Sequence, residues 1–176
     1  DKQLKECLIN VLGKNKCRII TVPPRKWVLE FTDGGKVYHL LVRTCTYLGN
    51  PHPIFKKRVQ LPLWFNEYTN NVHKNNPNID VRYIGVYHYA DEYHGENVVF
   101  IDFKKDTYLL KKGHNSSAHV YTNDLFQAMT YGIFTKEDQF GNTITAVRKD
   151  RFKDYLLNRQ QKSANLFDLF RRFNCG

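Results

Sequence analysis

Cysteine is scarce in this sequence, and its spacing argues against two kinds of stabilising site. The four cysteines are Cys7, Cys17, Cys45 and Cys175, and no two of them form a CxxC pair. They also lack histidine partners at zinc-finger spacing, so we expect no structural zinc. A chain of 176 residues can bury a core without disulfides, and free thiols in a reducing cytosol are the simplest interpretation.

Long apolar runs are missing as well. The sequence contains no stretch of about 18 apolar residues, so no transmembrane helix is predicted. Residues 1–6 lack the apolar segment that opens a signal peptide. We therefore expect a cytoplasmic protein with no membrane partner. The sequence also begins without an initiator Met, and we expect it to be a fragment of a longer protein.

Acidic residues are outnumbered, and this imbalance is the most informative property of the composition. The chain has 17 Asp and Glu against 27 Lys and Arg, which gives a formal net charge of +10. A folded domain this basic repels itself, and attraction to phosphate is the commonest reason to keep such a charge. Together with an aromatic content of 14%, the charge predicts a nucleic-acid partner, most of all double-stranded DNA. The alternatives are a surface charge that serves solubility and a ribosomal-type protein.

Hydrophobic periodicity and turn residues predict an α+β fold. Helices are expected over residues 2–13, 62–75, from Thr122 or Asn123 to about 131, and 150–157. Strands are expected over residues 17–22, 27–32, 36–46, 80–89, 97–104 and 145–148, with residues 108–110 extending the sheet. Residues 47–60 and 111–117 are expected to be irregular. Strands meet through tight turns more often than through helices, which favours a mixed, largely antiparallel central sheet flanked by helices.

The predicted domain covers residues 1–160. Residues 161–176 form a separate amphipathic helix in this interpretation, because Leu166, Phe167, Phe170 and Phe173 make an apolar stripe. Such a stripe needs a partner surface, so we expect this C-terminal helix to pack on a second copy of the chain or on a missing domain.

Two carboxylates and a lysine are expected to meet at the open end of one hairpin. Asp80 begins the strand 80–89, and Asp102-Phe103-Lys104 ends the strand 97–104. In an antiparallel hairpin these two ends lie side by side. Two carboxylates can hold Mg²⁺ through oxygen ligands, and a neighbouring lysine can steady or deprotonate the attacking water in phosphodiester hydrolysis.

This pattern resembles the PD-(D/E)XK superfamily, which includes most restriction endonucleases. The resemblance covers about residues 60–105 and implies a restriction-endonuclease-like fold and Mg²⁺-dependent DNA cleavage. It implies Asp80 and Asp102 as metal ligands, Lys104 as the lysine, and Glu67 on the helix 62–75 as the helical acid. The sequence departs from the pattern because no proline directly precedes Asp80, and because the second strand runs into a basic stretch instead of a helix.

A rival register places the catalytic strand of that superfamily earlier, at residues 38–46. The acid position then holds Leu41 and the lysine position holds Arg43. A protein with this pair can bind DNA and is poorly equipped to cut it. The rival register therefore predicts a DNA-recognition module without catalysis.

Polar and basic sets elsewhere are candidates for phosphate and base contacts. The candidate nucleic-acid-binding residues are Lys56, Lys57, Arg58, Lys111, Lys112, His114, Asn115, Ser116, Arg148, Lys149 and Arg151. They fall in loops and near turns of the predicted fold, which favours a sheet scaffold that binds nucleic acid with loops. A further cluster, His88, Asp91, Glu92 and His94, has metal-binding residue types but suits a solvated hairpin turn better.

Three functions follow from these features. The first is a DNA-binding protein of the restriction or phage-defence type, with a Mg²⁺-dependent endonuclease centre as its catalytic version. The second is a non-catalytic recognition module of a larger restriction or modification enzyme. The third is an RNA-binding or protein-interaction domain that uses exposed aromatic side chains for stacking.

Overall fold

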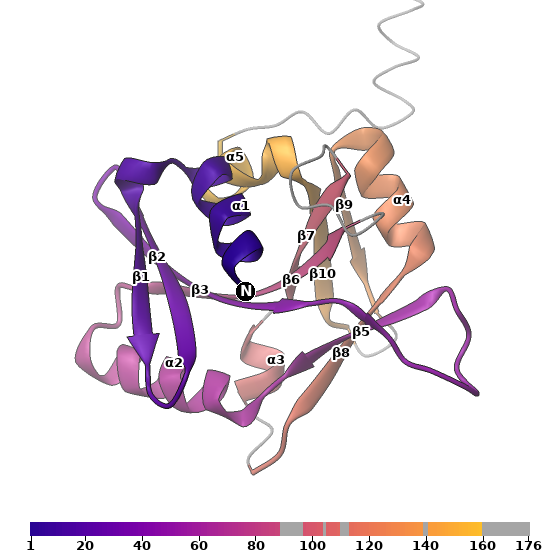
Figure 1. The fold of residues 1–176 in the computed structure, drawn as a ribbon, viewed down its shortest axis with the longest axis horizontal. Coiled ribbons are helices and arrows are strands. Elements are labelled where there is room, and N and C mark those ends of the chain that lie inside the picture. The colour runs from indigo at the N-terminus through magenta and orange to yellow at the C-terminus, as the bar shows by residue number, and fades with distance from the viewer. Residues whose placement is uncertain (89–96, 104, 110–112, 139–140, 160–176) are drawn as a thin grey trace, which may run out of the picture.

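A seven-stranded sheet forms the centre of the molecule (Figure 1). The computed structural model describes residues 1–88, 97–103, 105–109, 113–138 and 141–159. The strands of this sheet are β1 (Cys17–Val22), β2 (Lys26–Asp33), β3 (Lys36–Thr44), β6 (Asp80–His88), β7 (Val98–Phe103), β9 (Ile133–Glu137) and β10 (Thr143–Arg148). Their spatial order is β1-β2-β3-β6-β7-β10-β9. Only the β3–β6 pair is parallel, so the predicted mixed, largely antiparallel sheet is confirmed. The restriction-endonuclease-like assignment stays a prediction.

Helices cover both faces of this sheet, as the sequence predicted. On one face lie α1 (Lys2–Leu12) and, after a 3-10 turn at Lys149–Arg151, α5 (Phe152–Leu156). Leu4, Leu8 and Leu12 recur at the spacing of one helix face and are buried. On the other face lie α2 (Leu63–Asn75), α3 (Lys105–Leu109) and α4 (Thr122–Tyr131). None of the helices in the described part of the chain is long and apolar enough to cross a membrane.

A second, three-stranded sheet packs on the face that carries α2 and α4. Its strands are β4 (Thr46–Tyr47), β5 (Lys56–Leu61) and β8 (Ser116–Tyr121), in the order β4-β5-β8. Val59 and Leu61 of β5 are buried in the core between the two sheets. They approach the large sheet at Gly85 of β6, where a Cβ atom would lie only 2.8 Å from Val59 Cγ2. Because Gly85 has no side chain, β5 can pack closely against β6 at this point.

Two predictions about irregular segments are wrong. Residues 47–60 contain the last residue of β4 and most of β5, so Lys56, Lys57 and Arg58 lie on a strand and not in a loop. The segment 111–117 runs into β8, which begins at Ser116. Both strands were missed because β5 pairs with β8 far along the chain, as in the partners Val59 and Ala118.

The prediction that residues 108–110 extend the sheet is also wrong, because residues 105–109 form α3. Tyr108 is buried in the core, and its carbonyl oxygen accepts a hydrogen bond of 2.9 Å from Asn66 Nδ2 of α2. Packing against α2 thus outweighs the β preference of the tyrosine. The sequence was expected to lack a helix after the strand that contains Asp102. The structure places α3 directly after this strand, β7.

Some predicted features fall outside the described residues. These are the C-terminal helix at 161–176 and, from the hairpin turn, Asp91, Glu92 and His94. His88 is the last residue of β6.

Candidate nucleic-acid interface

A cationic pocket opens where the beginning of β2 lies beside the end of β3. Its volume is about 260 Å³. Its lining residues are Asp1, Leu4, Arg25, Lys26, Trp27, Val42, Arg43, Thr44 and Trp64.

 Five of these residues are cationic or tryptophan side chains, so the pocket combines positive charge with aromatic rings.

The two tryptophans lie on opposite faces of the sheet, and each ring has a lysine ammonium group above it. Trp27 packs on the α1 side and Trp64 on the α2 side. Lys5 Nζ lies 5.2 Å from the centre of the Trp27 ring, and Lys26 Nζ lies 5.4 Å from that of Trp64. Such cation–π contacts hold lysines in place without neutralising them. The lysines therefore keep their charge available to a phosphate.

Arginines complete the positive charge of the pocket. Arg43 is exposed, and within the described part of the chain it has no carboxylate partner. Arg25 is exposed at the turn before β2 and has a φ of 121°, a backbone conformation that side-chain-bearing residues rarely adopt. Asp1 is the one acidic residue among those that line the pocket. The positive charge is therefore largely uncompensated.

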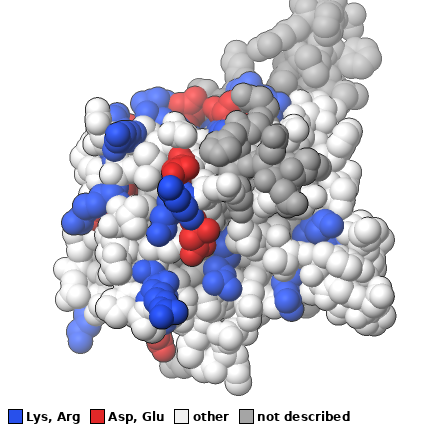
Figure 2. Space-filling model, viewed as in Figure 1, with Lys and Arg blue, Asp and Glu red and all other residues white. Residues whose placement is uncertain are grey.

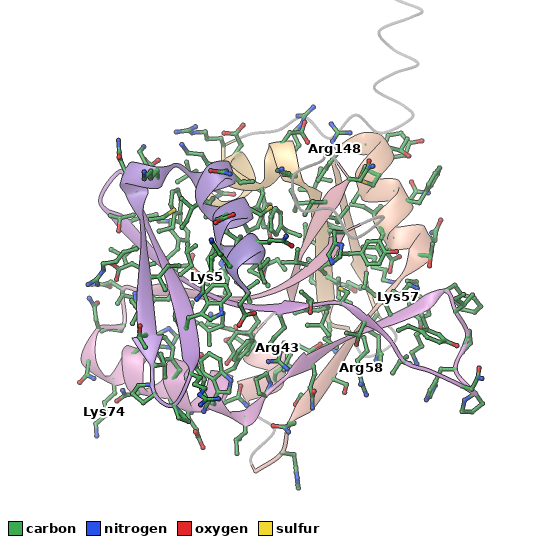
Figure 3. The ribbon with its side chains drawn as sticks, in the orientation of Figure 1. Lys5, Arg43, Lys57, Arg58, Lys74 and Arg148 are labelled. Atoms are coloured by element: carbon green, nitrogen blue, oxygen red, sulfur yellow. The ribbon has the colours of Figure 1, made fainter. Side chains whose placement is uncertain are left out.

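The positive surface continues from the pocket to β5 (Figures 2 and 3). Figure 3 shows Lys5, Arg43, Arg58 and Lys57 following one another across the viewed face, from α1 over β3 to β5. In Figure 2 the part of this face over β5 shows blue side chains and no red ones among the coloured residues. Arg58 Nε is buried and has no hydrogen-bond partner within the described chain. We call the set Lys5, Arg25, Lys26, Arg43, Lys57 and Arg58 the basic face.

The rival register of the sequence analysis falls at this pocket. Leu41 is fully buried in the core, whereas Arg43, two residues on, lines the pocket. The nearest acid on the facing strand, Glu30, is engaged: its Oε2 lies 2.8 Å from His39 Nε2. Tyr68 contacts the other ring nitrogen of His39 at 2.9 Å. In this register, β3 has Arg43 at the position of the superfamily's lysine. It has Leu41 at the position of the superfamily's acid.

Hydrogen bonds keep Glu30 ionised. Burial by itself would raise the pKa of Glu30, but hydrogen bonds from His39 and Arg18 outweigh burial and hold the pKa below its usual value. The carboxylate is thus a structural partner of two basic side chains.

Asp80 and Asp102 do meet in one pocket, of about 450 Å³, where β6 begins and β7 ends. Arg82 lies between them. Its Nε and Nη2 donate to the two oxygens of Asp80 at 2.7 and 3.0 Å, and its Nη1 donates to Asp102 Oδ2 at 2.7 Å. Tyr155 of α5 donates to the same Asp102 oxygen at 2.6 Å. Three of the four carboxylate oxygens, both of Asp80 and Oδ2 of Asp102, therefore already accept hydrogen bonds.

Arg82 offsets part of the negative charge of this cluster. Burial alone would lower the pKa of Arg82, but its bonds with Asp80 and Asp102 raise it well above its ordinary value. Burial raises the pKa of the Asp102 carboxyl, and Arg82 and Tyr155 act against that rise. The guanidinium lies between the two carboxylates and supplies one of the two positive charges that a divalent cation would bring. As placed, the two carboxylates fit Arg82 better than they fit Mg²⁺.

The other residues of the predicted catalytic centre are not part of this pocket's described lining. Glu67 is exposed on α2 and does not line it. Lys104 lies outside the described residues. Across the part of the chain that the structure describes, no group of three or more His, Cys, Asp or Glu side chains is placed to hold a metal ion. The predicted nuclease centre stays a prediction.

The predicted contact residues at 111–116 differ in their surroundings. Asn115 Oδ1 accepts a hydrogen bond of 2.9 Å from the Leu63 amide at the start of α2. Ser116 is buried and its hydroxyl has no hydrogen-bond partner in the described chain. His114 is exposed. Lys111 and Lys112 lie outside the described residues.

Lys56 faces away from the pocket and lines a separate groove of about 590 Å³, together with His119, Tyr121 and Lys136. This groove also contains Glu137 and Asp138, so its charge is mixed.

The predicted basic set at residues 148–151 is separate from the basic face. Arg148 binds both oxygens of Asp150, at 2.7 and 3.1 Å, and the Met129 carbonyl at 2.7 Å. Arg151 Nε lies 3.7 Å from Asp150, and Lys149 forms part of the 3-10 turn. Figure 3 shows Arg148 at the top of the molecule, well away from Lys57 and Arg58. These residues join β10 to α5 and are held by local partners.

Sequence reasoning missed the tryptophan pocket. Its residues come from the N-terminal segment, the turn before β2, the end of β3 and the start of α2. One local signal was available: the run Pro23-Pro24-Arg25-Lys26-Trp27 interleaves cations with an aromatic ring, which is typical of nucleic-acid contacts.

Comparison with known proteins gave one match. A family model described as Methylase-associated X1 matches residues 36–156, from β3 to α5 and thus more than half of the chain. No curated protein and no solved structure matches.

Proposed function

The chain belongs to the Methylase-associated X1 family, and on that premise we propose that it is a DNA-binding module of a restriction-modification system. In this proposal the module recognises DNA beside a methylase and does not cut it. The family description supplies the link to a methylase, and the net charge of +10 supplies the attraction to DNA.

The observation that carries the proposal is the cationic pocket with its two tryptophans. Arg25, Lys26 and Arg43 converge on it from different strands and turns, and the basic face continues to β5. These cations have no carboxylate partner among the described residues and repel one another, so their arrangement favours an anionic ligand. Arginine can also donate two parallel hydrogen bonds to a phosphate or to a guanine edge.

The proposal that the module does not cut DNA rests on the residues at the two candidate catalytic positions. In the register at β3, the acid position holds a buried leucine, Leu41. In the register at β6 and β7, both carboxylates are bound by Arg82. Each arrangement favours binding over hydrolysis.

A salt titration of duplex DNA binding tests the proposal. The logarithm of the affinity should fall linearly with the logarithm of the salt concentration. Arg43→Ala should weaken binding and reduce the salt slope by about one, as expected for the loss of one phosphate contact. Lys74→Ala is the matched control, because Lys74 is an exposed cation on α2 that Figure 3 places away from the basic face. It should leave the slope nearly unchanged.

Two outcomes would contradict the proposal. The first is undetectable binding of duplex DNA by the wild-type protein even at low salt. The second is an equal effect of Arg43→Ala and Lys74→Ala, which would show diffuse attraction instead of a defined interface. Binding of single-stranded RNA in clear preference to duplex DNA would favour the RNA-binding alternative.

A further inference from the structure

The β4–β5 arm, residues 46–61, carries most of the large apolar side chains that the described chain exposes. Ile54 is 73% exposed, Phe55 54% and Tyr47 45%, and the remaining one is Phe126 of α4 at 61%. Figure 1 shows the arm reaching out beyond the two sheets. Single exposed apolar residues are ordinary, but a group on one projecting hairpin indicates a contact surface.

Hydrogen bonds and ring contacts fix the arm against the body of the protein. The Phe55 carbonyl accepts bonds from the amide and the hydroxyl of Thr122, at 2.8 and 3.1 Å. The Phe55 ring stacks on Tyr121 with 6.3 Å between centroids. Within the arm, the Tyr47 hydroxyl donates to the His52 carbonyl at 3.1 Å. The arm is therefore ordered before any ligand binds, which reduces the entropy lost on binding.

Cations directly follow the apolar residues. Lys56, Lys57 and Arg58 come immediately after Phe55 and open β5. Because successive side chains of a strand alternate, Lys57 leaves β5 on the side of Val59, and Lys56 and Arg58 leave it on the other side. Lys57 and Arg58 are both partly exposed, so both contribute to the basic face. Cations on both sides of an apolar tip match a groove with a phosphate backbone along each wall. A protein surface that met the arm on one face would not use both sets.

We propose that the arm enters the minor groove of DNA and inserts Ile54 and Phe55 as a wedge between adjacent base pairs. Lys56, Lys57 and Arg58 then contact the phosphates on either side. This inference rests on the proposed DNA-binding function and adds the contact that deforms the duplex. Apolar wedges of this kind unstack a base step and bend DNA by about 20–90°.

The test uses a short duplex with central T-A steps, which unstack readily. A 2-aminopurine beside the central step reports unstacking, and dyes at the two ends report bending by energy transfer. Wild-type protein should raise the 2-aminopurine fluorescence and bring the ends closer. Ile54→Ala and Phe55→Ala should each reduce both signals at saturating protein and leave the salt slope of binding unchanged.

Matched controls separate the wedge from other roles. Ile54→Ala is the safer variant for folding, because Ile54 is mostly exposed whereas Phe55 packs on Tyr121. Phe126→Ala removes an equally exposed aromatic ring outside the arm and should leave both signals intact. Lys57→Ala should reduce the salt slope by about one and still permit bending at saturation.

The wedge and the proposed function fail in different ways. If the wild-type protein binds duplex DNA with a steep salt dependence but neither bends nor unstacks it, the wedge is wrong and DNA binding stands. If the Ile54→Ala/Phe55→Ala double variant bends DNA as well as the wild type does, the wedge is also wrong. That second result would assign the arm to a protein partner such as the methylase. If nothing binds at low salt, the proposed function itself fails.

Discussion

Replacing Gly85 with alanine tests how β5, with its basic residues, is held on the large sheet. The new Cβ would lie 2.8 Å from Val59 Cγ2 and 2.9 Å from Phe103 Cε2. Both neighbours are buried, so neither can move into solvent. Overpacking of this kind costs about 1–3 kcal/mol, and the better backbone preference of alanine offsets about 0.5–1 kcal/mol. We expect a net loss of about 1–2 kcal/mol in the free energy of unfolding.

A double-mutant cycle with Val59→Ala identifies the cause of that loss. Val59→Ala alone should cost about 2 kcal/mol, from lost burial and the cavity it leaves. In the double variant the alanine methyl at position 85 fills part of that cavity. The double variant should therefore be at least about 1 kcal/mol more stable than the sum of the single effects predicts. Urea unfolding followed by tryptophan fluorescence measures all four proteins.

Additivity would refute the reasoning. If the Gly85→Ala and Val59→Ala effects add to within about 0.5 kcal/mol, the two residues are not in contact and β5 lies elsewhere. Ile20→Ala provides the control cycle, because Ile20 packs on the same core from β1 and is not among the atoms nearest Gly85. Its effect should add to that of Gly85→Ala.

Three further predictions concern the carboxylates and the pocket. Plasmid DNA incubated with Mg²⁺ and wild-type protein should stay intact, as with Asp102→Ala; cleavage that EDTA and Asp102→Ala both abolish would instead establish the predicted nuclease. The only tryptophans of the chain, Trp27 and Trp64, line the cationic pocket, so duplex DNA should change the intrinsic fluorescence, and an unchanged spectrum at saturation would place DNA elsewhere. The lowered pKa of Glu30 gives stability that is present above its usual pKa of about 4.3 and lost as the pH falls further. Glu30→Gln should cost about 1 kcal/mol at neutral pH and flatten the acid side of the stability profile, measured by urea unfolding; an unaltered profile would exclude this role.

The sequence predicted those elements that local pattern determines. Residues 2–13 repeat leucines at helical spacing, and Asp33-Gly34-Gly35 joins two β-prone runs by a tight turn, which matches the β2–β3 hairpin. The strands β5 and β8 were missed for a physical reason. Only one face of each is apolar, and the partner strand that makes them a sheet lies far along the chain. Pairing of this kind leaves little local signal.

The sequence identified single residues of the candidate site but not how the fold groups them. Arg43 and the β5 cations were identified as charges, but the tryptophans that accompany Arg43 come from separate segments, which only the fold brings together. The proximity of Asp80 and Asp102 was anticipated from the hairpin. The role of Arg82 was not, although it lies two residues after Asp80 and so points to the same face of β6. That spacing was the signal available for recognising an ion pair instead of a metal site.

The position of β5 in the middle of the small sheet has a consequence for synthesis on the ribosome. One of its neighbours, β4, is made before it, but the other, β8, ends only at Tyr121. At about 5–20 residues per second, the intervening chain takes several seconds to emerge. During that interval Lys56, Lys57 and Arg58 lack the strand that aligns them. The β4–β5 arm is thus completed late, after the β2–β3 hairpin can already pair, and its three cations are held in one sheet only when most of the domain has been made.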